Sequence, residues 1–299
     1  MPASGPAKSK ISILHTDPLQ KLPWLVHGFS TRAGGTSRVY GGRALNLGFT
    51  KQDLRAAVKK NRAAFLQKLG IGGKHAWPIV TLRQIHSDLI HCVDGVLEHA
   101  LVGDGLVTAT PGLLFAIQTA DCLPVIVADT KKRAVGVFHA GWRGTVKRIV
   151  EKGVGSMRLY FGSRPRDLVA AIGPGVHNCC YKVGEEVREN FYSQFEYAAS
   201  LFHEVKESDP VREKYPLLFL TARAPGHSTL PVNIFLDLVE ANRRQLLDAG
   251  VMPKNIGAVP FCTSCRADLL FSYRAEKGIT GRLMGVAGIR PTDGGTRKK

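Results

Sequence analysis

Apolar residues recur at helical spacing in two segments of the chain. Between residues 54 and 69 they fall on one face, with Thr50 and Asp53 as start signals and Gly70 as a stop signal. Between residues 232 and 249 a second apolar stripe forms, and Gly250 follows it. The stripe positions are Leu54, Val58, Phe65 and Leu69 in the first segment and Phe235, Leu238, Val239 and Leu246 in the second. The spacing predicts two helices, each with one face towards the core.

Short apolar runs bounded by turn residues predict strands in the middle of the chain. They cover residues 25–31, 79–83, 113–118, 124–128, 134–138, 168–172 and 256–260. The strands between residues 113 and 138 follow one another through short turns, so the regular strand–helix alternation of a doubly wound sheet is absent. We therefore predict an α/β fold of the α+β type, a single-domain mixed-sheet sandwich with flanking helices. The domain is expected over residues 11–290, between disordered tails at 1–10 and 291–299.

Composition is that of a globular protein, with 44% hydrophobic and 22% charged residues. No apolar run approaches the length of a membrane span, and the first residues lack the apolar core of a signal peptide, so we expect a cytoplasmic protein without a membrane partner. The net charge is +17, but the basic residues are scattered and their densest groups, 59–62 and 297–299, contain no aromatic residues. This distribution does not favour a nucleic-acid partner, and the sequence leaves the oligomeric state unknown.

Six cysteines are too few for a disulfide scaffold in a chain of 299 residues, so we expect reduced thiols. Cys262 and Cys265 form a C-x₂-C pair, but no second pair lies at the spacing of a zinc ribbon. Cys179 and Cys180 are adjacent, and we expect them to pack a turn against the core.

Three predicted strands each deliver a metal-competent side chain at or near their end. These residues are His86, Cys122 and His139, with spacings of 36 and 17 residues. Structural zinc sites usually bring four ligands in close pairs, whereas catalytic zinc often takes three protein ligands and leaves a position open. An alternative makes Cys122 a nucleophile, with His139 or His86 as the base and Asp121 as the residue that orients it. The spacing does not separate a metal site from a thiol hydrolase.

Many motifs in one order resemble those of the YfiH-like family, whose members are described as polyphenol oxidases or laccase-domain proteins and as purine nucleoside phosphorylases. The motifs include HGFSTRAGGTS (27–37), LNLGF (45–49), QIHSD (84–88), DGLVT (104–108), TADCLPV (119–125), HAGWRGT (139–145), IGPGVHNCCYKVG (172–184) and FSYRAEKGITGR (271–282). The resemblance implies an α/β sandwich fold and places the family's metal ligands on His86, Cys122 and His139. It implies zinc, phosphorolysis of adenosine, inosine, guanosine and 5′-methylthioadenosine, and deamination of adenosine.

A purine nucleoside and phosphate are therefore the expected partners of the site. A zinc ion with an open position lowers the pKa of a bound water towards neutrality, which suits deamination. For the phosphate we expect Arg32 and Arg143, each beside glycines that let backbone N–H groups approach an anion. Asn46 is expected to bind ribose or base, or to form a turn. Asp121 is either a general acid or base or a residue that orients its loop.

Two other functions come from the same resemblance. Copper-dependent oxidation of phenols would use the same His₂Cys ligands, and copper binds such ligands tightly. However, none of the ten histidines forms the His-x-His pair expected of a multicopper oxidase. Some bacterial relatives are described as peptidoglycan editing factors, and hydrolysis of an amide in a cell-wall precursor by Cys122 or by a metal site is the second alternative.

Overall fold

The computed structural model describes residues 10–206 and 232–292. The chain divides into two compact units, residues 1–177 with 238–299 and residues 178–237. The tails predicted at 1–10 and 291–299 lie outside the described residues, except for positions 10, 291 and 292. The domain limits predicted from the sequence stay a prediction.

Two mixed β-sheets form the centre of the first unit, as the sequence predicted. The six-stranded sheet has the order β14 (Ile256–Ala258), β10 (Leu168–Ile172), β8 (Leu123–Asp129), β9 (Ala134–Ala140), β6 (Gly105–Thr108) and β5 (Ile90–Cys92). The five-stranded sheet has the order β1 (Ile13–Leu14), β2 (Leu25–Ser30), β15 (Leu283–Ile289), β7 (Leu114–Thr119) and β4 (Ile79–Thr81). The pairs β14–β10, β6–β5 and β7–β4 are parallel, and the other pairs are antiparallel.

The two sheets pack face to face, and one buried apolar cluster takes side chains from both of them. Phe115 and Ile117 of β7 share this cluster with Ile126 of β8 and with Val135 and Val137 of β9. Strand β8 is buried along its whole length, which explains its continuous apolar sequence. The sandwich is therefore held by burial between the sheets.

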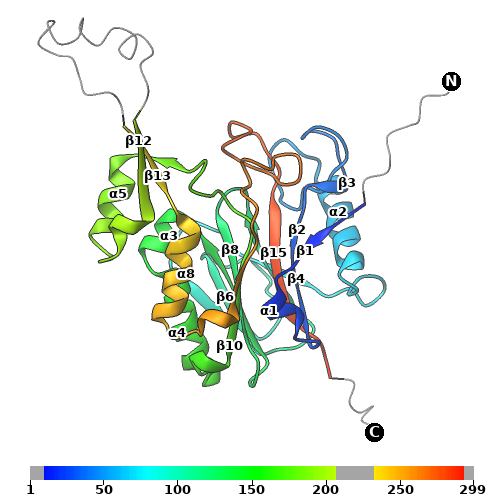
Figure 1. Ribbon diagram of the computed structural model, residues 1–299. Helices are drawn as coiled ribbons and strands as arrows, with labels where there is room; N and C mark the ends of the chain where they lie inside the picture. The colour runs from blue at the N-terminus through cyan, green and yellow to red at the C-terminus, as the bar shows by residue number, and fades with distance from the viewer. Residues whose placement is uncertain (1–9, 207–231, 293–299) are drawn as a thin grey trace, which may run out of the picture. The chain divides into compact units, whose positions relative to one another are not determined.

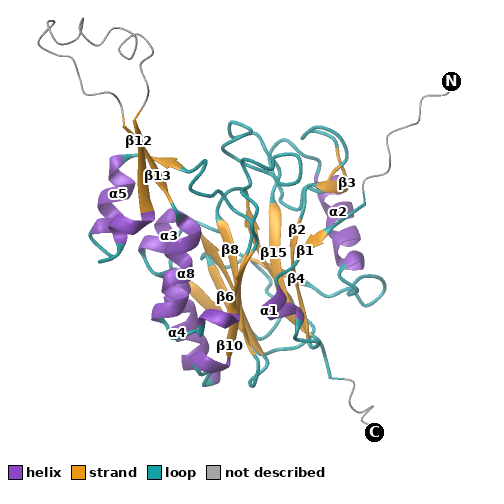
Figure 2. Ribbon diagram, in the orientation of Figure 1, coloured by secondary structure: helices purple, strands orange, loops and turns teal. Residues whose placement is uncertain are grey.

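Helices cover both outer faces of this sandwich (Figures 1 and 2). Helix α2 (Arg55–Lys68) packs Phe65 and Leu66 on the five-stranded sheet. Helix α4 (Ile149–Phe161) lies against the six-stranded sheet with α8 (Leu238–Asp248) beside it. The shorter elements are α1 (Asp17–Gln20), β3 (Ala33–Ser37), α3 (Trp142–Val146), η1 (Pro165–Asp167) and η3 (Pro253–Asn255). Within residues 10–206 and 232–292, each helix is too short or too polar to span a lipid bilayer.

The second unit contains a three-stranded sheet with the order β11 (Lys182–Val183), β13 (Val232–Leu236) and β12 (Phe202–Lys206). Helix α5 (Glu185–Tyr192) and η2 (Ala198–Leu201) accompany this sheet. The Phe191 ring lies 5.6 Å from the ring of Phe195 and 5.7 Å from that of Phe202, and these rings form the apolar centre of this small unit.

The helix predicted over 54–69 and the seven predicted strands are confirmed, within a few residues at their ends. The helix predicted over 232–249 was wrong in its first part, because residues 232–236 form strand β13 and the helix begins at Leu238. The apolar side chains of Ile234 and Leu236 alternate with less buried neighbours, a period of two that the helical stripe obscured.

Phe138 fills the space between β9 and α4, directly before His139 in the chain. Its ring is fully buried, and three glycines make room for it. A Cβ added at Gly105, Gly136 or Gly153 would lie 2.9, 2.6 or 2.4 Å from the ring. The buried ring therefore fixes strand β9 directly before His139, a candidate site residue.

We expect Gly153→Ala to lower the free energy of unfolding by about 1–3 kcal/mol, because its methyl group would overlap the buried Phe138 ring. Urea unfolding measures this change. Gly155→Ala in the same helix is the matched control, since a Cβ there meets nothing within 4 Å. The control should be neutral or stabilising by up to about 1 kcal/mol, and equal losses in both variants would contradict the packing argument.

Candidate metal centre

The three predicted ligands converge at one end of the sandwich. His86 lies in the loop after β4, Cys122 in the turn between β7 and β8, and His139 near the end of β9. The antiparallel register pairs Pro124 with His139, which brings the Cys122 turn beside the histidine. The Cys122 Sγ atom is 3.8 Å from His86 Nε2, and the candidate ligand atoms of all three residues lie within 4.8 Å of one another. The trio found in the sequence is thus one cluster in space.

Asp104, which the sequence reasoning did not single out, holds two members of this cluster. Its buried carboxylate accepts hydrogen bonds from the backbone N–H groups of Ile85, His86 and Ser87 at 3.2, 3.0 and 2.6 Å. It also accepts one from the Ser87 hydroxyl at 2.7 Å and contacts Nδ1 of His139 at 2.7 Å. The Asp104 carbonyl accepts the His139 backbone N–H at 2.7 Å. One residue therefore fixes both the loop of His86, whose φ is +59°, and the ring of His139.

Gly141 gives the cluster its space. A Cβ at this position would lie 2.9 Å from Cys122 Sγ and 3.0 Å from His86 Cδ2, too close for an unshifted structure. Gly141 precedes α3 in the HAGWRGT motif, so the motif supplies a ligand and, two residues later, the cradle beside it. The sequence reasoning did not identify this role.

The donor set fits a metal ion. Ligands of a tetrahedral zinc ion, with Zn–S near 2.3 Å and Zn–N near 2.0–2.1 Å, lie roughly 3.5 Å from each other, close to the observed separation of Cys122 and His86. His139 presents Nε2 because Nδ1 faces Asp104. His139 is buried, Cys122 is partly exposed and His86 is exposed, so the cluster opens to solvent on one side. Two imidazoles and a thiolate fit zinc and also copper.

Electrostatics couples the Cys122 thiol to the imidazole of its neighbour His139. Burial disfavours the charged forms of both groups, but their mutual attraction outweighs it, with help from His86 for the thiolate and from the Asp104 carboxylate for the imidazolium. As a result the pKa of Cys122 falls to about 6 and that of His139 rises to about 9. Burial also opposes ionisation of Asp104, yet hydrogen bonds from His139 and Ser87 hold its pKa well below the ordinary value. Without a metal ion, a thiolate and an imidazolium therefore face each other at neutral pH.

Arg32, predicted to contact phosphate, lies in a network of protein partners. Its guanidinium donates to the carbonyl of Ala267 at 2.8 Å and to the carbonyl of Tyr40, and it pairs with Glu276 at 2.8 Å. It also lies 5.0 Å above the Phe271 ring. The prediction of a phosphate contact for Arg32 stays a prediction.

Asn46, predicted to bind ribose or base, is fully buried. Its amide group donates to the carbonyl of Gly48 and to Asp53 at 2.9 and 2.7 Å. Its oxygen accepts the backbone N–H groups of Gly48 and Arg282 at 3.1 and 2.9 Å. These bonds build a turn, the alternative role considered for Asn46, and a substrate contact stays a prediction.

Arg143 differs from the other two predicted contacts. It lies on α3, two residues after Gly141, and its side chain is exposed. Its guanidinium stacks on the Trp142 ring at 4.3 Å and has no ion pair within residues 10–206 and 232–292. Arg143 is thus an exposed charge on the helix that follows Gly141.

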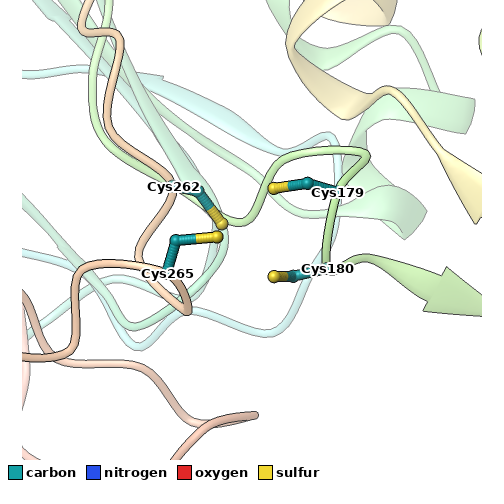
Figure 3. Close-up of side chains that lie close together, drawn as sticks. All are labelled: Cys179, Cys180, Cys262 and Cys265. Atoms are coloured by element: carbon teal, nitrogen blue, oxygen red, sulfur yellow. The ribbon is translucent and has the colours of Figure 1, made fainter.

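The remaining cysteine motifs lie in loops. In the first unit the side chains of Cys262 and Cys265 come from one loop, and Cys262 Sγ accepts the His177 backbone N–H at 3.4 Å (Figure 3). In the second unit Cys179 and Cys180 occupy the turn before β11. The predicted turn is confirmed, but Cys179 is exposed, so its predicted packing against the core was wrong.

Comparisons with known proteins agree with the fold. Residues 26–290 match the family model described as multi-copper polyphenol oxidoreductase laccase. A purine nucleoside phosphorylase of Deinococcus radiodurans is 38% identical over 93% of this chain and 96% of its own length. The purine nucleoside phosphorylase YlmD of Geobacillus stearothermophilus is 34% identical over 89% of this chain and 90% of its own. The crystal structure of the Bacillus licheniformis protein YfiH has a TM-score of 0.75 and 30% identity, covering 95% of this chain and 98% of that one.

We expect Asp104→Asn to weaken zinc binding about 10–100-fold. The NH₂ group of the amide would face N–H groups, such as those of Ser87 and His139, whose hydrogen bonds the carboxylate accepts. Competition with a chelator measures the affinity. The matched control is Asp129→Asn, at the far end of β8, where another buried carboxylate accepts two backbone N–H groups. Equal zinc affinity in the two variants would show that Asp104 acts only on stability.

In metal-free protein we expect alkylation of Cys122 by iodoacetamide to rise with a midpoint near pH 6, because the thiolate is the reactive form. Peptide mass spectrometry at a series of pH values measures the extent at each cysteine. Cys92 is the internal control, since burial and the nearby Asp94 carboxylate raise the pKa of its thiol above the ordinary value. A Cys122 midpoint as high as that of Cys92 would contradict the ion pair.

Proposed function

The chain belongs to the multi-copper polyphenol oxidoreductase laccase family, and we propose that within it the protein is a zinc-dependent purine nucleoside phosphorylase that also deaminates adenosine. The proposed substrates are adenosine, inosine, guanosine and 5′-methylthioadenosine, with phosphate as the second substrate. The observation that carries the proposal is the open cluster of His86, Cys122 and His139. Relatives named purine nucleoside phosphorylase, similar along nearly their whole length, support an enzyme of this class.

His86, Cys122 and His139 would hold the zinc ion. When bound, zinc supplies Lewis acidity that polarises an oxygen of the substrate or of water. Cys122 enters the site as a thiolate, which its low pKa favours, and the two histidines enter as neutral imidazoles. With these ligands a divalent ion keeps a net charge of about +1. Copper could occupy the same ligands.

Asp104 has the task of directing the proton of His139. Its carboxylate accepts the Nδ1–H group, which orients the ring and leaves the Nε2 lone pair facing the cluster. The same carboxylate holds the backbone around His86. The exposed side of the cluster leaves room for a nucleoside to approach from solvent.

Phosphate needs a cation near the reacting sugar, and Arg143 is the residue that we assign to it. Its guanidinium is exposed on α3, two residues after Gly141, and it has no ion pair in the described part of the chain. A guanidinium binds phosphate through parallel N–H donors. Arg143 would therefore serve phosphorolysis and leave deamination, which uses no phosphate, unaffected.

One observation favours a second candidate function, thiol-dependent hydrolysis of an amide in a cell-wall precursor. The arrangement matches that of a thiol hydrolase: Cys122 would be the nucleophile, His139 its base and Asp104 the residue that orients the base. The orienting carboxylate is that of Asp104, whereas the sequence suggested Asp121. Such a hydrolase would work without metal, which separates it from the first proposal.

We expect zinc-loaded protein to convert adenosine to adenine and ribose 1-phosphate only when phosphate is present, and to inosine in either condition. Cys122→Ala should lower both rates by about 100-fold or more, because it removes a ligand. Arg143→Ala should raise the KM for phosphate and leave the phosphate-independent rate unchanged. Chromatography of the products measures all of these, with Cys92→Ala as the control at an exposed cysteine outside the cluster.

Turnover that survives Cys122→Ala would contradict the proposal. Amide hydrolysis of a cell-wall precursor that persists in chelator would favour the thiol hydrolase. Phenol oxidation by copper-loaded protein, without nucleoside turnover by the zinc-loaded form, would favour an oxidase.

A further inference from the structure

Asp121, the residue before Cys122, has an unusual backbone conformation. Its φ is +89°, a region that residues other than glycine adopt at a cost of about 1–3 kcal/mol. Its carbonyl accepts the Val176 N–H at 2.8 Å. This conformation aims the next side chain, Cys122, at the two histidines. The surroundings have to hold it there.

The Asp121 side chain is bound by three donors from one segment of the chain. One carboxylate oxygen accepts the hydroxyls of Thr263 and Ser272 at 2.6 and 2.7 Å. The other accepts the backbone N–H of Arg274 at 2.7 Å. All three donors belong to residues 263–274, which include the start of the FSYRAEKGITGR motif and have no role in the proposed chemistry. With both oxygens occupied, Asp121 is poorly placed to transfer a proton.

The donor segment is itself tied down at a second point. The Glu276 carboxylate accepts the Ser272 backbone N–H at 3.3 Å and the Thr280 hydroxyl, and it pairs with Arg32 at 2.8 Å. Arg32 also donates to the carbonyl of Ala267 at 2.8 Å. A continuous set of polar contacts therefore runs from Arg32 through Glu276 and Ser272 to Asp121.

We propose that Asp121 is a positioning residue whose carboxylate, held by Thr263, Ser272 and Arg274, fixes the Cys122 thiol for metal binding. It does for Cys122 what Asp104 does for the histidines. Preorganised ligands bind a metal ion more tightly, because less order has to be created on binding. The inference rests on the metal cluster of the proposed function and is independent of which substrate is used.

The test measures metal binding alone. Metal-free protein is titrated with Co²⁺, whose absorption reports bonding to the thiolate, and the zinc affinity is obtained by competition with a chelator. Two variants are compared. Asp121→Asn keeps the shape of the side chain and tolerates the positive φ of this position, whereas Asp121→Gly relieves the backbone strain but removes the carboxylate. The control is Asp268→Asn, at an exposed carboxylate of the same segment that pairs with Arg266.

Both Asp121 variants should bind zinc about 10–100-fold more weakly than the parent and give a reduced cobalt–thiolate absorption, while the control binds as the parent does. Thr263→Val with Ser272→Ala should reproduce the loss from the donor side. Parental zinc affinity in Asp121→Gly would overturn the proposal, because the carboxylate would then do no more than offset the strain of the Asp121 backbone. If Asp121→Gly does not fold, parental affinity in Asp121→Asn overturns it equally. A folded protein with intact metal binding but no nucleoside turnover would instead refute the proposed function.

Discussion

The Asp104 carboxylate joins the two parts of the candidate metal centre. His139 lies on a central strand of the six-stranded sheet, whereas His86 lies in a loop that leaves the edge strand β4 of the other sheet. Hydrogen bonds from both parts end on this one buried side chain. Five hydrogen-bond donors surround it and stabilise its negative charge. Without the Asp104 carboxylate, no shared side chain would hold the two imidazoles in position relative to each other.

The sandwich makes such a frame possible. Strands β8 and β9 are buried by a second sheet on one face and by helices on the other, so their ends are rigid points from which turns can extend. Phe138 anchors β9 against α4 one residue before His139. Loops attached to rigid elements hold functional side chains within the tolerances that chemistry needs. The three glycines that contact Phe138, and Gly141 beside the cluster, act in the same way, since each leaves space that a neighbouring side chain fills.

The candidate ligands could be picked out in the sequence because their chemistry is visible in single residues that follow apolar strands. The residues that hold them could not, because their roles arise from contacts between distant positions. Asp104 acts on residues 18 and 35 positions away, and its only local signal was its place just before a strand in the DGLVT motif. Strand β15 was missed for a related reason, since Gly285 and Gly288 suggest a loop. In the structure a Cβ at Gly285 would lie 2.5 Å from Pro124, so glycine is needed for packing between sheets.

Solvent exposure differs sharply among the three candidate ligands, and this difference sets the direction from which the cluster can be reached. His139 is enclosed by protein on its Asp104 side, whereas His86 faces solvent. In the proposed zinc site, an ion arriving from solution would meet the exposed imidazole first and would leave past it last. The loop that carries His86 would therefore govern the rate of metal exchange, while the affinity would depend on all three residues. Two proteins with the same ligands and fold can for this reason keep different metals, according to how long each ion resides.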